Sequence, residues 1–112
     1  MATPKPALPS LTHLQFLVLG VLRAEEQSGR AIRQVLAAYG VKRSGPAFYQ
    51  LMARLERDGL IEGWYEAVVV GDQAVRERRY RITAAGTRAW RQTRAFYETV
   101  AAAAAQGRLA NA

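Results

Sequence analysis

Residues 44–86 hold the pattern that most restricts how this chain can fold. One stretch there has the apolar spacing of a helix with a single buried face, at positions 48, 51, 52 and 55. Two β-rich runs follow at residues 61–70 and 75–83, on either side of a polar turn. The second run is crowded with arginine and leads into a new helical pattern at Thr83. A helix, a hairpin and a further helix in this order are the plan of a winged helix-turn-helix.

Two helical patterns precede this unit and complete the expected domain. Residues 11–24 are mostly apolar and begin with Thr12, which has the spacing of a capping box with the glutamine three positions later. Gly20 lies within this segment, and its small size predicts a close helix crossing there. Ser28 starts a second amphipathic segment that reaches residue 39. The expected fold is mainly α with a small β-hairpin, a winged helix-turn-helix plus a C-terminal dimerisation helix.

The chain divides into four parts by composition and periodicity. Three of the four prolines fall within the first ten residues, where they disfavour helix. The last helical pattern contains a run of alanines, which have the highest helix propensity. The expected parts are a flexible N-terminal arm (1–10), a winged-helix DNA-binding domain (11–84), the dimerisation helix (85–107) and a disordered tail (108–112).

The charge of the chain points to a polyanionic partner. The 112 residues include 16 Lys+Arg and 9 Asp+Glu, which gives a net charge of +7. Residues 76–94 alone hold seven arginines and one glutamate. Arginine pairs with phosphate in a bidentate manner and also enters minor grooves. Such a balance favours nucleic acid as the partner, with an anionic membrane surface as the second choice.

Catalysis, metal binding and membrane insertion find no support in the sequence. There is no cysteine, and His13 is the single histidine, on an apolar segment without a partner for acid–base work. The acidic residues show no metal-ligand spacing, and there is no glycine-rich phosphate loop. No apolar run approaches the ~18 residues of a membrane span. We expect a cytoplasmic protein that is not an enzyme, has no cofactor and does not enter a membrane.

The predicted third helix carries the candidates for reading bases. A helix in the major groove needs polar side chains near its N-terminal half. Gln50 could bind adenine and Ala47 could touch a thymine methyl, although Gln50 could equally be an exposed spacer. Tyr49 could donate to a phosphate or brace neighbouring helices instead. The predicted DNA-binding residues are Lys42, Arg43, Ser44, Ala47, Tyr49, Gln50, Arg54, Arg76, Arg78 and Arg79. The last three are expected toward the tip of the hairpin.

The run SGPAFYQLMARLERDGLIEG and the later RRYRITAAG resemble the PadR-like winged-helix transcription regulators. Members of that family open the recognition helix with Ser/Pro-Gly-Thr-aliphatic-Tyr, close it with Leu-Glu-x-x-Gly-Leu, and share the wing-to-helix pattern. The matching positions are Tyr49, Arg54, Leu55, Glu56, Gly59, Leu60, Tyr80, Arg81, Ile82, Thr83 and Gly86. The likeness covers roughly residues 11–97. It departs where Ala47 replaces a usual threonine and Gln50 a frequent proline.

The resemblance implies a sequence-specific regulator of transcription that binds double-stranded DNA, acts as a repressor and is released by a small molecule. It also implies a homodimer, joined largely through the C-terminal helices, on an operator with half-sites ~34–36 Å apart. The predicted dimerisation residues are Leu14, Trp90, Thr93, Phe96, Tyr97 and Val100. Trp64, Tyr65, Trp90 and Phe96 could line a pocket for a small-molecule effector between subunits, although core packing is the alternative for these side chains.

Other functions remain open at this level. The same winged helix could serve as a protein-interaction or assembly module with a basic surface and no operator. The MarR-like regulators share the wing-to-helix pattern, but they usually have longer flanking helices at both ends. Binding to a membrane surface would need a basic amphipathic helix, a description that the final helix meets weakly.

Overall fold

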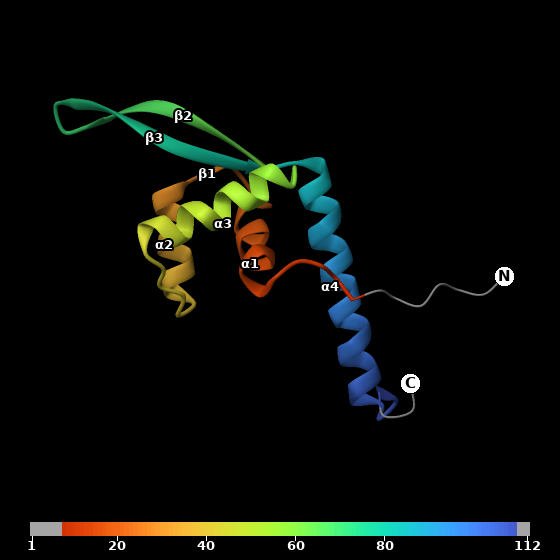
Figure 1. The fold of residues 1–112 in the computed structure, drawn as a ribbon. Coiled ribbons are helices and arrows are strands. Elements are labelled where there is room, and N and C mark those ends of the chain that lie inside the picture. The colour runs from red at the N-terminus through yellow and green to blue at the C-terminus, as the bar shows by residue number, and fades with distance from the viewer. Residues whose placement is uncertain (1–7, 110–112) are drawn as a thin grey trace.

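The computed structural model describes residues 8–109 (Figure 1). Its helices are α1 (His13–Leu22), α2 (Gly29–Ala38), α3 (Gly45–Arg57) and α4 (Ala84–Ala105). Its strands are β1 (Gln27–Ser28), β2 (Ile61–Val70) and β3 (Gln73–Ile82). These elements confirm the winged helix-turn-helix with a C-terminal helix. The predicted N-terminal arm and C-terminal tail lie largely outside the described residues.

Each of the four helices in residues 8–109 begins at a serine or threonine whose hydroxyl accepts a backbone hydrogen bond. These N-caps are Thr12, Ser28, Ser44 and Thr83, and each bonds the N–H three residues later. The capping box predicted at Thr12 is confirmed, because the Gln15 side chain also accepts from the Thr12 N–H at 3.0 Å. The sequence therefore marks every helix start through local chemistry alone.

The sheet is antiparallel, with strand order β1-β3-β2. β2 and β3 pair from Ile61 opposite Ile82 out to Val70 opposite Gln73. The turn is shorter than expected, since β3 begins at Gln73 rather than at residue 75. Gly71 allows this tight turn by adopting a φ of 63°. The sequence did not predict β1, whose two residues pair with Tyr80 and Arg79 and are too few to show a pattern.

The core lies between the first three helices and the root of the hairpin. The predicted buried face of α3 is confirmed, since Phe48, Met52 and Leu55 are buried and Leu51 is partly buried. Tyr80 joins them from β3 and is buried as predicted. The other buried apolar residues are Val18, Leu19, Leu22, Ile32, Leu36 and Ile61. The outer half of the hairpin projects past α2, away from this core (Figure 1).

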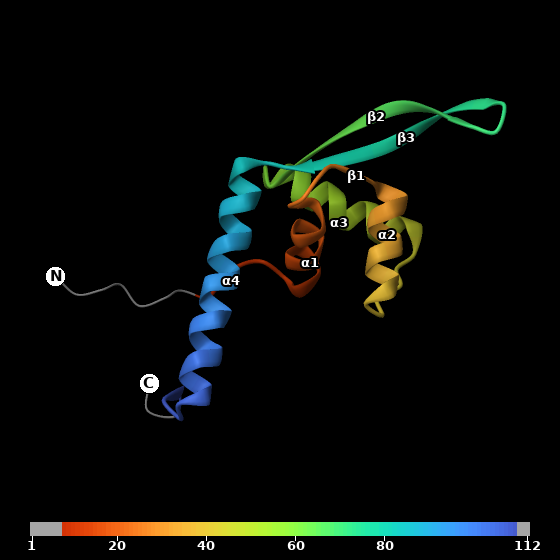
Figure 2. The same ribbon diagram turned by 180° about the vertical axis from the view of Figure 1, so that it is seen from behind.

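Helix α4 packs against α1 through its first half. The indole nitrogen of Trp90 lies 3.1 Å from where a Cβ on Gly20 would stand, which confirms the close crossing predicted there. Phe16 stacks on the same indole with ring centroids 5.4 Å apart. The second half of α4 runs beyond the domain in both views (Figures 1 and 2). Within residues 8–109, no helix is both long enough and apolar enough to span a membrane.

Candidate nucleic-acid interface

Helix α3 presents one exposed stripe opposite its buried face. The exposed residues lie three and four positions apart: Pro46, Tyr49, Gln50, Ala53, Arg54 and Arg57. Tyr49 is prominent, with 59% of its surface exposed. Ala53 was missed as a candidate, although the helical period that predicts the buried face also places it at the centre of the opposite one. A small residue there lets a partner approach the helix backbone closely.

A groove of 730 Å³ lies between the hairpin and the helices α2 and α3. Six basic residues line it, namely Arg30, Arg33, Lys42, Arg43, Arg76 and Arg78. Tyr49 of the α3 stripe also faces this groove. Arg33 donates to the Arg43 carbonyl at 3.0 Å and lies over the Phe48 ring. Arg30 and Arg33 were not predicted as DNA-binding residues, because arginines on the polar side of an amphipathic helix are usually exposed to solvent without binding a ligand.

A second, smaller hollow of 380 Å³ lies on the other side of α3, against the start of α1. Ala47, Gln50 and Arg54 line this hollow, together with Leu14 of α1. Arg43 borders both hollows. The structure therefore places the predicted base-reading residues on one side of α3 and most phosphate-binding candidates on the other.

Ser44 is the exposed N-cap of α3. Its hydroxyl oxygen accepts the Ala47 N–H at 3.2 Å. Its own O–H can still donate to a partner, because capping uses only the acceptor. Ser44 could consequently donate a hydrogen bond to a partner without breaking the helix cap.

Arg78 secures the hairpin to the end of α3. Its guanidinium donates to Glu56 at 2.7 Å, and the side chains are 25% and 27% exposed. Gly63 makes this pair possible, because the Glu56 carboxylate occupies the space that a side chain on Gly63 would fill. Burial alone would lower the pKa of Arg78, but the interactions with Tyr80 and Glu56 outweigh it and raise that pKa. The charge of Arg78 is thus already balanced within the chain.

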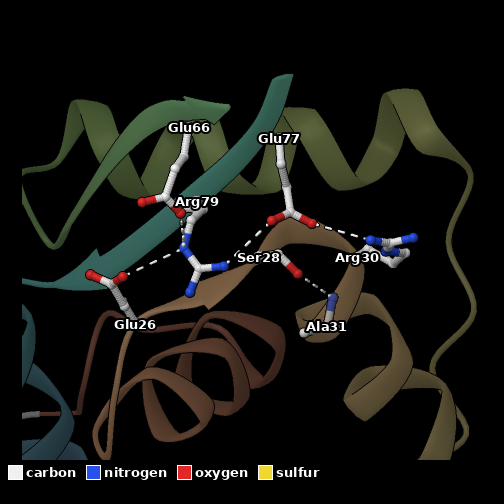
Figure 3. Close-up of polar contacts among 7 residues, drawn as sticks. All are labelled: Glu26, Ser28, Arg30, Ala31, Glu66, Glu77 and Arg79. Atoms are coloured by element: carbon white, nitrogen blue, oxygen red, sulfur yellow. Dashed lines mark hydrogen bonds and ion pairs between the residues drawn. The ribbon is translucent and has the colours of Figure 1, made fainter. Parts of the chain in front are cut away.

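Arg79, a predicted DNA-binding residue, lies outside the basic groove. Alternation along β3 turns it to the face opposite Arg78, where its guanidinium meets three carboxylates (Figure 3). The distances are 3.5 Å to Glu26, 3.2 Å to Glu66 and 3.4 Å to Glu77. The Arg79 Nε is buried and makes no well-aligned hydrogen bond, so Glu26 and Glu66 hold it by charge. Arg79 therefore fixes the hairpin to the segment around β1, and its charge is balanced within the chain.

The tip of the hairpin is apolar rather than basic. Val69 is 76% exposed and Val70 is 52% exposed, and Asp72 adds a negative charge in the turn. The expectation that Arg78 and Arg79 lie toward the tip is wrong, because β3 starts early and leaves both of them nearer the root. Arg76 is the outermost arginine of the hairpin, and its guanidinium lies 4.7 Å from the Tyr65 ring centroid.

Residues 18–92 match the family model described as the transcriptional regulator PadR-like family. The chain belongs to this family. Among solved structures, the crystal structure of a PadR family transcriptional regulator from Eggerthella lenta DSM 2243 is 31% identical. That match has a TM-score of 0.64 and covers 83% of this chain and 79% of that one.

Two more distant PadR structures share the fold. A PadR family regulator from hypervirulent Clostridium difficile R20291 has a TM-score of 0.72 at 16% identity, covering 85% of this chain and 97% of that one. Bacillus subtilis PadR, crystallised in complex with operator DNA, has a TM-score of 0.57 at 20% identity, covering 71% of this chain and 45% of that one. No curated protein sequence matches the chain significantly.

In this PadR-like chain, two of the predicted dimerisation residues are covered by the chain itself. Thr93 is 2% exposed, and its hydroxyl donates to the Ala89 carbonyl at 2.7 Å. Trp90 is partly buried against the core, with Phe16 stacked on its ring and the Arg23 guanidinium 3.9 Å from the ring centroid. Apolar residues of a helix that packs on its own chain look the same in sequence as residues of a subunit interface.

The remaining predicted dimerisation residues of α4 keep an accessible surface. Phe96 and Val100 are partly exposed, and Tyr97 is 45% exposed and packs edge-on against Phe96. They lie on the half of α4 that extends beyond the PadR-like domain (Figure 2). Leu14, in contrast, lines the hollow beside α3.

The four aromatic residues named for an effector pocket lie apart in this PadR-like chain, so a pocket formed by all of them would need a second subunit. Trp64 and Tyr65 are adjacent on β2 and point to opposite faces. The Arg81 guanidinium lies over the Trp64 ring, while those of Arg76 and Arg78 both lie over the Tyr65 ring. None of the four lines either hollow described above. Within residues 8–109, no three His, Cys, Asp or Glu side chains are grouped to hold a metal ion.

Proposed function

We propose that this chain is a sequence-specific regulator that binds double-stranded DNA as a homodimer and represses transcription. One observation carries the proposal: the basic groove and the exposed stripe of α3 adjoin at Tyr49. The groove can take a phosphate backbone while the stripe enters the adjacent major groove. Phosphate contacts position a protein on DNA and base contacts give it specificity, so a continuous surface supports both tasks.

The phosphate contacts are assigned to Lys42, Arg43 and Arg76. All three side chains are exposed and line the basic groove. No carboxylate lies within ion-pair distance of them among the described residues. Their charge is consequently available to displace counterions from DNA, which supplies most of the sequence-independent affinity.

Base reading is assigned to Gln50, with Ala47 and Arg54 beside it. Gln50 is exposed on α3, and its side chain can accept and donate toward the edge of an adenine. Bacillus subtilis PadR, which shares this fold, has been crystallised with operator DNA, and this likeness supports DNA as the partner. The lack of a threonine hydroxyl at Ala47 predicts a footprint that differs from other members of the family.

The second half of α4 is assigned to dimerisation. An exposed apolar face on an extended helix needs a partner, and Phe96, Tyr97 and Val100 form such a face. A second copy of α4 supplies an equivalent face under two-fold symmetry. Two DNA-binding domains then bind two half-sites ~34–36 Å apart, and an operator covered in this way is closed to polymerase. The family resemblance supports repression and release by a small molecule.

Salt dependence tests the assignment of phosphate contacts. We expect Arg43→Gln and Arg76→Gln each to lower the slope of log affinity against log salt by about 0.9 on duplex DNA. Arg91→Gln is the matched control, since Arg91 is exposed on α4 away from the groove. Equal losses in all three variants, or affinity that ignores salt, would contradict the proposed surface.

A second candidate function rests on the apolar tip of the hairpin. Val69 and Val70 are highly exposed, and an exposed apolar patch is typical of a protein contact. A protein-interaction or assembly module would use this tip and bind every duplex equally weakly. Fluorescence anisotropy with several duplex sequences separates the two functions, because only a regulator prefers one of them strongly.

A further inference from the structure

Among the described residues, Glu77 is the one acidic residue that lines the basic groove. The groove is bordered by six basic side chains, so a carboxylate among them lowers its attraction for an anion. Glu77 is 17% exposed, which means that it is held in place rather than extended into solvent. The proposed DNA contacts do not explain why a carboxylate should stand there.

The two carboxylate oxygens of Glu77 hold different guanidinium groups. One oxygen accepts from Arg30 at 3.2 Å, and the other accepts from Arg79 at 3.4 Å. Figure 3 shows Glu77 between these two arginines, with Arg30 on the side toward α2. Glu77 thus links the fixed root of the hairpin to a cation at the border of the groove.

The two arginines depend on Glu77 to different degrees. Arg79 also lies beside Glu26 and Glu66, so it stays anchored without Glu77. Arg30 has no other carboxylate within ion-pair distance among the described residues, and its side chain is 68% exposed. An ion pair exposed to this extent is weak and screened by salt. Loss of Glu77 should therefore release Arg30 while leaving the hairpin in place.

We propose that Glu77 competes with DNA phosphate for Arg30 and so limits the affinity of the groove for DNA in general. The inference rests on the proposed DNA-binding function. A carboxylate that offsets one cation weakens phosphate contacts on every sequence equally, because these contacts carry no base information. Contacts from α3 to bases then make up a larger share of the binding, which favours the operator over random DNA.

The test compares Glu77→Gln with the wild type on a fluorescein-labelled duplex of random sequence over a series of salt concentrations. We expect Glu77→Gln to bind roughly three- to tenfold more tightly near 0.1 M salt, with a slope steeper by up to about 0.9. Glu62→Gln is the matched control. Glu62 also pairs with an arginine of the hairpin, Arg81 at 2.7 Å, but lines neither hollow.

A double variant tests whether Glu77 acts through Arg30. In the Arg30→Gln background, Glu77→Gln should improve affinity no more than Glu62→Gln does, because its partner is absent. If circular dichroism shows that Glu77→Gln does not fold, a second comparison tests the inference with Glu77 in place. Arg30→Gln should then reduce the salt slope less than Arg43→Gln, whose charge has no carboxylate partner among the described residues.

The outcomes distinguish failure of the proposed DNA binding from failure of the proposed competition between Glu77 and DNA for Arg30. Wild-type protein that binds no duplex would overturn the proposed function, and the inference with it. Wild-type binding together with a Glu77→Gln affinity equal to that of Glu62→Gln would overturn the inference alone. The inference would also be wrong if Glu77→Gln bound DNA more weakly, or if Arg30→Gln and Arg43→Gln reduced the slope equally.

Discussion

Gly86→Ala should destabilise the protein even though it places alanine in a helix. Gly86 is buried in the first turn of α4, and a Cβ there would overlap the Leu60 carbonyl oxygen and lie 2.8 Å from Ile82 Cγ1. The Leu60 oxygen cannot move away freely, because it accepts the Thr83 N–H at 3.1 Å. Thr83 is fixed in turn, since its hydroxyl donates to the Gly59 carbonyl at 2.7 Å and accepts the Gly86 N–H.

Two opposing effects set the size of the loss. Alanine has a helix propensity about 1 kcal/mol better than that of glycine. Overpacking a close contact costs about 1–3 kcal/mol or more. Because the Leu60 oxygen cannot shift, the cost for Gly86→Ala should lie at or above the upper end of this range. The net destabilisation should be about 2 kcal/mol or more, which lowers the melting temperature of a domain of this size by about 8 °C or more.

Thermal unfolding followed by circular dichroism measures this loss. Gly45→Ala is the matched control, because Gly45 also lies in the first turn of a helix but has no atom within 4 Å of its Cβ position. We expect Gly45→Ala to leave the melting temperature unchanged or to raise it slightly. A Gly86→Ala variant as stable as the wild type would refute the close docking of α4 on the turn before β2.

Three further predictions concern single side chains. Gln50→Ala should change discrimination at one base position by ~1–3 kcal/mol in competition binding, and an unchanged sequence preference would show that Gln50 reads no base. Tyr97→Glu should shift the protein toward monomer in sedimentation equilibrium, whereas Tyr39→Glu, on an exposed tyrosine at the end of α2, should not. Burial raises the pKa of Tyr80 against the opposing effect of Arg78, so the folded state keeps this proton to higher pH than the unfolded state. The free energy of unfolding should consequently fall as the pH rises above about 10, and Tyr80→Phe should reduce that fall in pH-dependent denaturation.

The fold could be predicted because its signals are local. Each helix start has a serine or threonine cap, and the buried face of α3 follows from a period that four apolar residues define. The hairpin could also be predicted from the sequence, since its two strands flank a glycine, which adopts positive φ in the turn. β1 could not be predicted, because a two-residue strand exists only through its pairing with β3.

The candidate site was harder to predict, because the sequence shows which side chains are charged but not which of them form ion pairs within the chain. Arg78 and Arg79 are adjacent and chemically identical, yet Glu56 balances one and three other carboxylates surround the other. Glu26 lies far from Arg79 along the chain and is brought near it by the pairing of β1 with β3. The same limit applies to Thr93, whose burial depends on how α4 packs within the chain. Only tertiary structure separates arginines that stabilise the hairpin from those left for a ligand.

Selection of bound duplexes from a pool of random DNA tests the central claim most directly. We predict that repeated selection enriches one sequence with two-fold symmetry and half-sites ~34–36 Å apart. The protein should bind this sequence about a thousandfold or more tightly than random DNA at the same salt concentration. Enrichment of no sequence, with equal affinity for every duplex, would contradict the account of this chain as a sequence-specific regulator.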